Sequence, residues 1–238
     1  MNDEYKLAVI KNPFFNKEYD KGKFIFSQAI SLRMEGYAYV HGENIIPIDQ
    51  YDFFSTNLLI YKEKAKENII PFACCKIISY RDCLKNNLPF PPLEYLKGDK
   101  NKDSLLEVTK LITEAENDIS FVCSFTIAPE LQGTQESLSV IKYTLGSVLN
   151  WHKDKKINFI TSATLKVKTD KLFKRLGLLE VSKNPLYYLK SINNEEAIMM
   201  KYIHTPSKQG KKWLNDSFDL WEERIEYNSS KKKESIYA

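Results

Sequence analysis

The sequence predicts a mixed α/β (α+β) domain whose central sheet is partly parallel and is flanked by helices. In the second half of the chain, strand and helix patterns alternate, which requires crossover connections between neighbouring parallel strands. In the first half, two aliphatic runs flank a charged turn, the pattern of two successive strands. With 43% hydrophobic residues in 238, the chain can bury a sizeable core.

Apolar spacing and turn residues place the elements of the first half. Apolar residues from Phe24 to Met34 recur at helical spacing, and we take Gly36 as the stop of that helix. The proline-rich stretch after Leu88 is expected to be an irregular crossing loop, because prolines lack the N–H that regular structure uses. The first half is thus predicted to contain a helix at 21–35 and strands at 57–61 and 69–78. The crossing loop at 88–92 and a second helix at 103–116 follow.

The second half shows clearer periodicity. Apolar side chains alternate from Ile119 to Ile127, which is the period of a strand, and Pro129 ends the run. A turn at 131–134 leads into a long amphipathic helix, and Gly177 stops a later one. We predict strands at 119–127, 157–161, 186–192 and 197–202, and helices at 138–152 and 169–176.

The C-terminal segment is predicted to be one amphipathic helix followed by a basic tail. The stripe Leu214, Phe218, Trp221 and Ile225 favours a single helix that docks on the domain or on a partner. Lysines 231–233 are expected to form a solvated end. We therefore divide the chain into a domain over 1–205 and a C-terminal helix and tail over 206–238.

Composition narrows the function classes. The 35 basic and 31 acidic residues leave a net charge of +4 and predict a mixed surface, so we expect no nucleic-acid partner despite the basic residues near 153–156 and 166–174. No run of about 18 apolar residues exists, so no membrane span is expected.

The charged N-terminus lacks the apolar centre of a signal peptide. The four cysteines form no Cys-x-x-Cys pair, which predicts buried free thiols in the cytoplasm and no metal site.

Two stretches resemble the GNAT acyltransferases. Residues 129–138 resemble the turn that opens that family's long helix, and residues 171–178 resemble its later helix ending in Leu-Gly. The resemblance implies a GNAT-like fold with splayed strands in the central sheet, in which amides at a helix N-terminus face the phosphates of coenzyme A or a phosphopantetheine arm. It also implies acyl-CoA or acyl-phosphopantetheine as donor substrate, acyl carrier protein as a partner and no permanently bound cofactor. The implied donor-binding residues are Phe125, Ile127, Gln132, Gly133, Thr134 and Gln135.

The donor region departs from the family pattern at three positions. Gln135 replaces the second glycine of the turn, and Glu136 places a negative charge at the helix start. An acid there is also an ordinary partner of the helix dipole. Phe173 stands where many family members keep a tyrosine that protonates the leaving thiolate.

The first half is similar to the acyl-homoserine-lactone synthases and the N-acyl amino acid synthases. An early arginine, aromatic residues, an Asp-x-x-Asp pair and a basic residue on a later strand occur in the same order here. The resemblance implies an acyl and acceptor cleft shaped by Arg33, Tyr37, Asp49, Asp52 and Lys76. The alternative is that these charges form salt bridges that order this part of the chain.

The resemblance implies transfer of an acyl group to an amine. The strand 121–125 carries none of the charged residues that lactone synthases keep there, which favours an amino acid or similar small amine as acceptor. No catalytic residue is assigned, and Ser124 and Thr126 are the candidates. His41 and His152 are isolated in the sequence, and the sequence places no histidine near Cys123, so no catalytic role is predicted for these three residues. The alternative function is a GNAT-like domain without catalysis that binds an acyl donor or a protein.

Overall fold

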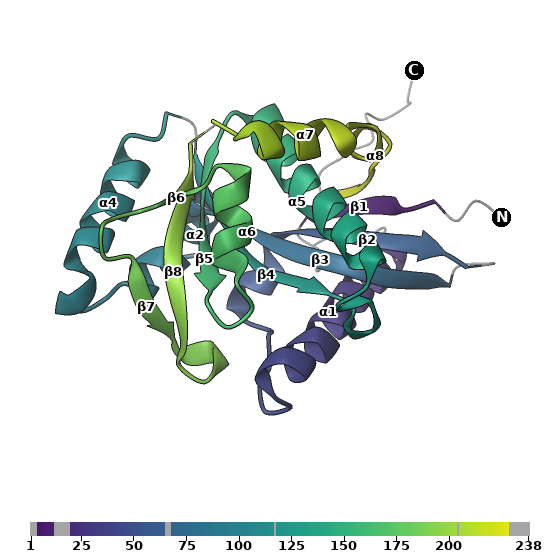
Figure 1. The fold of residues 1–238 in the computed structure, drawn as a ribbon, viewed down its shortest axis with the longest axis horizontal. Helices are drawn as coiled ribbons and strands as arrows, with labels where there is room; N and C mark the ends of the chain where they lie inside the picture. The colour runs from purple at the N-terminus through teal and green to yellow at the C-terminus, as the bar shows by residue number, and fades with distance from the viewer. Residues whose placement is uncertain (1–3, 12–19, 65–67, 117, 204, 229–238) are drawn as a thin grey trace, which may run out of the picture.

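The computed structural model describes residues 4–11, 20–64, 68–116, 118–203 and 205–228. Nine strands form one sheet in the order β6-β8-β5-β4-β3-β2-β1-β9, and β7 pairs with β8 outside this path. Only the β4–β5 and β1–β9 pairs are parallel; the others are antiparallel. The predicted mixed sheet is confirmed. In Figure 1, β8 runs down the view whereas β2 and β3 run across it.

The strands are β1 (Lys6–Lys11), β2 (Thr56–Glu63), β3 (Ile69–Ser79), β4 (Ile119–Ile127), β5 (Asn158–Thr164), β6 (Leu179–Glu180), β7 (Leu186–Leu189), β8 (Glu195–Tyr202) and β9 (Ile225–Asn228). The α-helices are α1 (Asp20–His41), α2 (Tyr80–Lys85), α3 (Pro91–Tyr95), α4 (Lys102–Thr113), α5 (Gln135–Lys155), α6 (Thr169–Leu176), α7 (Lys208–Asp216) and α8 (Phe218–Glu222). Four short 3₁₀ turns are η1 (Gln50–Phe53), η2 (Asp99–Asn101), η3 (Pro129–Leu131) and η4 (Lys190–Ile192).

Two expectations about turn residues were wrong. Gly36 does not stop the first helix, because α1 continues to His41. The glycine serves close packing instead, since a Cβ there would lie 2.2 Å from Thr126 Cγ2 on β4. The proline-rich stretch is also not wholly irregular: Pro91 begins α3, at a helix start whose N–H groups have no partner inside the helix in any case.

The C-terminal segment also differs from the single predicted helix. Its apolar stripe is divided among α7, α8 and strand β9, which pairs with β1 and adds a strand to the sheet. Neither β1 nor β9 was predicted, although the apolar run 7–10 is buried in the middle of this edge. The predicted basic tail lies outside the described residues.

The helices bury two apolar clusters against the sheet. The first cluster joins α1, α5, α6 and the C-terminal helices to strands β1–β5. The second lies beneath η1 and α2–α4 and continues along β7 and β8. In the described part of the chain no helix is both long and apolar enough to cross a bilayer.

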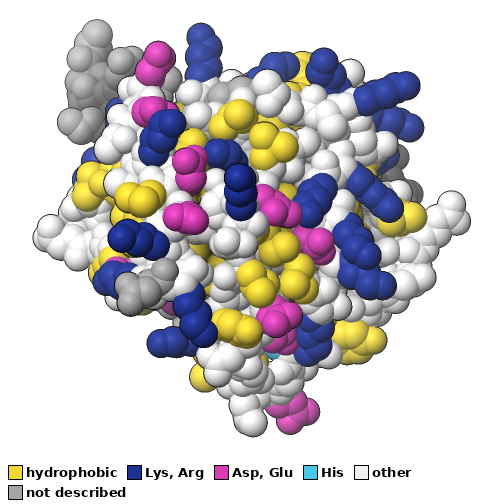
Figure 2. Space-filling view, turned by 60° about the vertical axis from the view of Figure 1, so that its left-hand side comes forward, with side chains coloured by type: hydrophobic (Ala, Val, Ile, Leu, Met, Phe, Trp, Pro, Cys, Tyr) yellow, Lys and Arg dark blue, Asp and Glu magenta, His cyan; other side chains and the backbone are white. Residues whose placement is uncertain are grey.

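The surface carries interspersed charges. Figure 2 shows the side of the molecule that lies at the left of Figure 1, where basic and acidic side chains alternate around small apolar patches. Ion pairs such as Lys174–Glu180 at 2.6 Å and Lys201–Glu107 at 3.5 Å account for part of this mixture. The mixed surface predicted from the composition is present on this face.

Helix α7 packs on α5 at a point where only glycine fits. A Cβ at Gly146 would lie 2.3 Å from Ser217 Oγ and 2.5 Å from the carbonyl oxygen of Trp213. Asn150 stabilises the same contact, because its Nδ2 donates to Leu214 O at 3.1 Å and to Ser217 Oγ at 3.0 Å. The C-terminal helices are therefore held directly against the long helix of the domain.

We expect Gly146→Ala to lower the free energy of unfolding by about 1–3 kcal/mol, the usual cost of overpacking a filled site. The neighbouring change Ser147→Ala is the control, because the buried Ser147 hydroxyl has no hydrogen-bond partner among the described residues. Chemical unfolding measures both variants. Equal stability of Gly146→Ala and the unmodified protein would contradict the close packing of α5 and α7.

Candidate functional site

The parallel strands β4 and β5 separate in the middle of the sheet. Their pairing runs from Ile119–Asn158 to Val122–Thr161 and ends there, although β4 continues to Ile127 and β5 to Thr164. Beyond this point β4 stays paired with β3, and β5 stays paired with β8. The backbone edges of β4 and β5 that face each other therefore lack ladder hydrogen bonds, and the predicted splay is confirmed.

A β-bulge lies on β4 just beyond the point of separation. Cys123 pairs with Lys76 and Thr126 pairs with Cys74, so that Ser124 and Phe125 lie opposite one residue of β3. Ser124 has a φ of 53°, a left-handed conformation that is uncommon for residues other than glycine. The extra residue turns the backbone of β4 locally and re-aims the side chains on either side of it.

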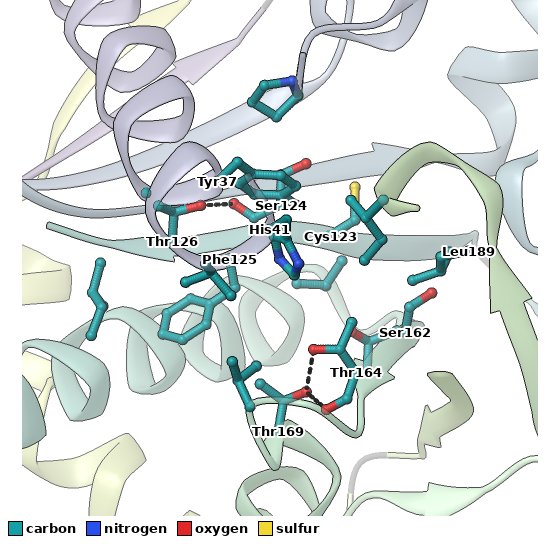
Figure 3. A pocket seen from close by; sticks show the side chains of 18 of the residues that line it. Tyr37, His41, Cys123, Ser124, Phe125, Thr126, Ser162, Thr164, Thr169 and Leu189 are labelled. Carbon is teal, nitrogen blue, oxygen red and sulfur yellow. Dashed lines mark hydrogen bonds between the residues drawn. The ribbon is translucent and has the colours of Figure 1, made fainter. Parts of the chain in front are cut away.

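A cavity of about 460 Å³ opens between the separated strands. It is bounded by β4 from Phe121 to Ile127, by β5 and by the first turns of α5. Helices α1 and α6, the segment 45–49 and residues of α3, β7 and η4 form the rest of the wall. Figure 3 shows Cys123, Ser124, Phe125 and Thr126 from β4, with Ser162 and Thr164 from β5. The predicted residues Ser124, Phe125, Thr126 and Ile127 thus share one wall.

The start of α5 borders this cavity. Thr134 caps the helix by accepting a hydrogen bond from Ser137 N at 3.2 Å. Gly133 has a φ of 81°, and no atom lies within 4 Å of the position that a Cβ would take, so the turn backbone is open to an approaching group. Gln132 and Gly133 line the cavity, whereas Thr134 and Gln135 do not. The structure thus brings four of the six predicted donor-binding residues to the cavity wall.

Glu136, at the start of α5, directs its negative charge to partners outside the cavity. Glu136 accepts a hydrogen bond from the Tyr5 hydroxyl and another from Lys62 Nζ at 3.3 Å. The hydrogen bond from Tyr5, followed by that from Lys62, lowers the pKa of Glu136. Glu136 is absent from the cavity lining. Its carboxylate therefore stabilises the attachment of β1 and β2 to α5, and it does not fill the position in front of the free amides.

Helix α1 forms the opposite wall. The missing side chain of Gly36 lets the helix approach Thr126 on β4, and this places Tyr37 beside the bulge. Tyr37 lines the cavity together with Ser124, and burial raises the pKa of its phenol. Tyr37 therefore brings a phenol to the cavity wall from α1, whereas Phe173 lines the cavity from α6 and has no hydroxyl.

Behind this wall two buried cations meet one buried carboxylate, Asp52, and one partly exposed carboxylate, Asp49. Arg33 Nη2 donates to Asp52 Oδ1 at 2.7 Å, and Lys76 Nζ donates to Asp49 Oδ1 at 2.8 Å and to Asp52 Oδ2 at 3.3 Å. Arg33, Asp52 and Lys76 are buried, and only Asp49 reaches the cavity. Burial alone would lower the pKa of Arg33, but the adjacent carboxylate of Asp52 outweighs burial and raises it.

The geometry of this cluster follows from local structure. Asp49 caps η1 and Asp52 accepts from the Asp49 backbone N–H at 2.9 Å, which is the reciprocal capping box. Both carboxylates therefore face one side and meet the cations of α1 and β3. Of the five predicted cleft residues, Tyr37 and Asp49 line the cavity, and the other three hold the segment 45–53 in place.

Two residues limit the chemistry of the cavity. Burial raises the pKa of the Cys123 thiol to about 11, so this half-buried cysteine stays protonated at neutral pH. Phe173 lines the cavity without a hydroxyl to offer. Among the described residues, no group of three or more His, Cys, Asp and Glu side chains forms a metal site.

Two histidines occupy different settings. His152 is buried, with Nε2 bonded to Ser120 Oγ at 2.6 Å and Nδ1 to Val148 O at 2.7 Å. His41, at the end of α1, lines the cavity and lies 2.7 Å from Glu195 Oε1 on β8. The sequence carries no local signal for the pair of His41 and Glu195, because 154 positions separate the two residues and neither belongs to a motif.

Neutralising one buried carboxylate tests the charge cluster. We expect Asp52→Asn to lower the free energy of unfolding by about 3–5 kcal/mol, because it leaves two buried cations with one carboxylate. The control Glu63→Gln breaks the exposed pair with Lys6 and should cost about 1 kcal/mol or less. Thermal and urea unfolding of both variants measure the difference, and equal losses would contradict a buried cluster.

The fold is shared with solved acyl-transferring enzymes. The chain matches no protein-family model and no curated protein sequence. It is similar to the structure of the AHL synthase LasI, at 16% identity and a TM-score of 0.50, over 84% of this chain and 89% of that one. It is also similar to BjaI, a CoA-dependent acyl-homoserine lactone synthase solved with SAM and isopentyl-CoA. That match has 12% identity and a TM-score of 0.57, over 94% of this chain and 93% of that one.

Identities this low are informative about the fold alone. In this chain the fold has an open mixed sheet, in which β4 separates from β5 and a helix begins beside the separation. The chain therefore has the GNAT-like acyltransferase fold, in the form found in acyl-homoserine-lactone synthases.

Proposed function

We propose that this chain is a cytoplasmic N-acyltransferase that moves an acyl group from an acyl thioester to the amine of an amino acid or similar small acceptor. The donor is acyl carrier protein or acyl-CoA. The observation that carries the proposal is the separation of β4 from β5 beyond Val122 and Thr161, with the N-terminus of α5 at its edge. A thioester arm is an extended chain with amide groups, and it suits a slot between two unpaired strand edges.

The separated edge of β4 supplies what an acyl transfer needs. The N–H groups beyond Val122 that point towards β5 lack ladder partners, and the bulge at Ser124 changes their direction. Such fixed N–H groups stabilise the negative charge that develops on the carbonyl oxygen when an amine attacks. Thioesters are already reactive, so most of the acceleration comes from holding donor and amine in position.

The turn before α5 is the proposed site for the phosphates of the donor. Gly133 leaves room in front of the first amides of α5, and the positive end of the helix dipole favours an anion there. Carrier protein and coenzyme A both present a phosphopantetheine arm, so this turn suits either. BjaI, which shares the fold, was solved with isopentyl-CoA.

The apolar and hydroxyl-bearing walls of the cavity suit the remaining parts of the substrates. Ile141, Leu145 and Leu172 offer apolar surface for an acyl chain. Tyr37 and Asp49, on the opposite wall, offer a hydroxyl and a carboxylate to an acceptor amine. In this proposal the buried partners Arg33 and Lys76 hold Asp49 and its segment in place and do not touch the substrate.

A binding domain without catalysis is the second candidate. Phe173 favours it, because no hydroxyl stands at the position where many acyltransferases of this fold protonate the thiolate. The Tyr37 phenol favours the enzyme, since it supplies a hydroxyl to the same cavity from α1.

Amine-dependent thiol release separates the two candidates. The protein is mixed with octanoyl-CoA or octanoyl carrier protein and a panel of amino acids and amines, and free thiol is measured with a thiol reagent. We expect thiol release that requires both protein and amine, together with an amide product seen by mass spectrometry. Tight donor binding with no release under any amine would overturn the enzyme in favour of the binding domain.

Filling the cavity from α5 tests the proposed donor site. We expect Ile141→Trp to weaken octanoyl-CoA or octanoyl carrier protein binding at least tenfold, about 1.4 kcal/mol, because the indole occupies the slot. Leu138→Trp is the matched control, since Leu138 is exposed on the same helix and does not line the cavity. Calorimetry measures both affinities, and equal binding by the two variants would place the donor elsewhere.

A further inference from the structure

His41 and Glu195 form an ionisable pair at the cavity wall. His41 ends α1, and its Nδ1 lies 2.7 Å from Glu195 Oε1, at the start of β8. Lys166 Nζ reaches the same oxygen at 3.0 Å and also donates to Val40 O at 2.7 Å. The three side chains come from α1, β8 and the segment after β5, and Lys166 holds the carboxylate that hydrogen-bonds to the imidazole.

The hydrogen bond decides which ring nitrogen carries the proton. Burial would raise the pKa of Glu195, but the hydrogen bonds from His41 and Lys166 outweigh it and lower that pKa, so the carboxylate is ionised at neutral pH. An ionised carboxylate only accepts, and Nδ1 must therefore carry the hydrogen. In the neutral ring Nε2 then keeps its lone pair, and no hydrogen bond joins it to another described residue.

The imidazole lines the same cavity as the proposed reaction centre. His41 lines the cavity between the separated strands, and Figure 3 shows its ring with Ser124 and Phe125 of β4 and with Thr164 of β5. Its ring centroid is 5.2 Å from that of Tyr37, which lines the cavity together with Ser124 at the bulge. One aromatic ring thus separates the histidine from the backbone that would hold the carbonyl.

The other charged group of the lining is already paired. Asp49 accepts from Lys76 at 2.8 Å, so its carboxylate already belongs to an ion pair while it faces the acceptor amine. Strand β4 from Phe121 to Phe125 contains no ionisable carboxylate or amine. An acceptor amine is protonated at neutral pH and cannot attack until it loses a proton. Of the described residues that line the cavity, His41 is the one whose neutral form offers a ring nitrogen with a lone pair for this step.

We propose that His41 is the general base that deprotonates the acceptor ammonium, with Glu195 as a positioning residue that fixes the imidazole and stabilises its charged form. This inference rests on the proposed acyl transfer. The ammonium gives one proton to Nε2, and its freed electron pair forms the C–N bond while the carbonyl π pair moves to oxygen. When the carbonyl re-forms, the C–S bond breaks and its pair leaves on sulfur. The second nitrogen proton goes to the thiolate, and the imidazolium returns its proton to solvent.

Three neighbours set the charge around the base. Tyr37 faces the ring from α1, Glu195 faces it from β8, and Lys166 faces Glu195 from the segment after β5. Asn193 Nδ2 donates to the His41 carbonyl at 3.2 Å and fixes the end of α1 without touching the ring. The carboxylate balances the positive charge that the ring acquires, as in catalytic dyads on other folds.

The test compares two nucleophiles that differ in protonation. With octanoyl-CoA or octanoyl carrier protein, His41→Gln is expected to lower kcat at neutral pH about 100-fold for an amino acid or alkylamine of the panel, a usual contribution of general-base catalysis. Hydroxylamine is largely unprotonated at neutral pH, so the same variant should lose less than about threefold with it, because no proton has to be removed before attack. Raising the pH should restore the alkylamine rate of the variant.

Control variants separate catalysis from folding and from the proposed function. Glu195→Gln should lower kcat about tenfold with KM unchanged, whereas Glu196→Gln, the neighbouring exposed carboxylate, should leave both unchanged. Equal losses with both nucleophiles, or none with either, would overturn the role of His41 while acyl transfer stands. An unmodified protein that releases no thiol with any amine overturns acyl transfer itself. Melting temperatures confirm that each variant is folded.

Discussion

The separation of β4 from β5 beyond Val122 and Thr161 is the constraint on which the rest of the site depends. Leaving strand edges unpaired inside a domain is costly, because each N–H and C=O loses a ladder partner. The chain keeps the two edges apart by pairing each strand firmly on its other side, β4 with β3 and β5 with β8. The cavity is the volume that this arrangement leaves between two well-ordered half-sheets.

Close packing at small residues brings the walls of that cavity together. Gly36 lets α1 lie against Thr126, and one residue later Tyr37 meets the bulge at Ser124. A larger residue at position 36 would push α1 away from β4 and move Tyr37 and His41 with it. The wall opposite α5 is therefore positioned by a contact that has no chemical function of its own.

The buried charges have a comparable supporting role. Arg33, Lys76, Asp49 and Asp52 balance one another, and their hydrogen bonds attach the segment after α1 to the middle of β3. Since buried ion pairs contribute little net stability, their value here lies in specifying one arrangement. The family resemblance pointed to these residues as a cleft. The structure shows a cluster that touches the cavity only through Asp49 and supports it from behind.

The sequence by itself determined the local elements and the fold class. Strand β4 has its predicted limits, 119–127, and α6 has its predicted limits, 169–176, because alternation and a C-terminal glycine are short-range signals. The short strand β9 was not predicted, because it pairs with β1, whose residues lie more than 200 positions away in the chain. Only the tertiary structure decided that Glu136 binds Tyr5 and Lys62, that Gly36 continues a helix, and that His41 meets Glu195. Each of these results from packing between elements distant in sequence, and local propensity carries no information about such contacts.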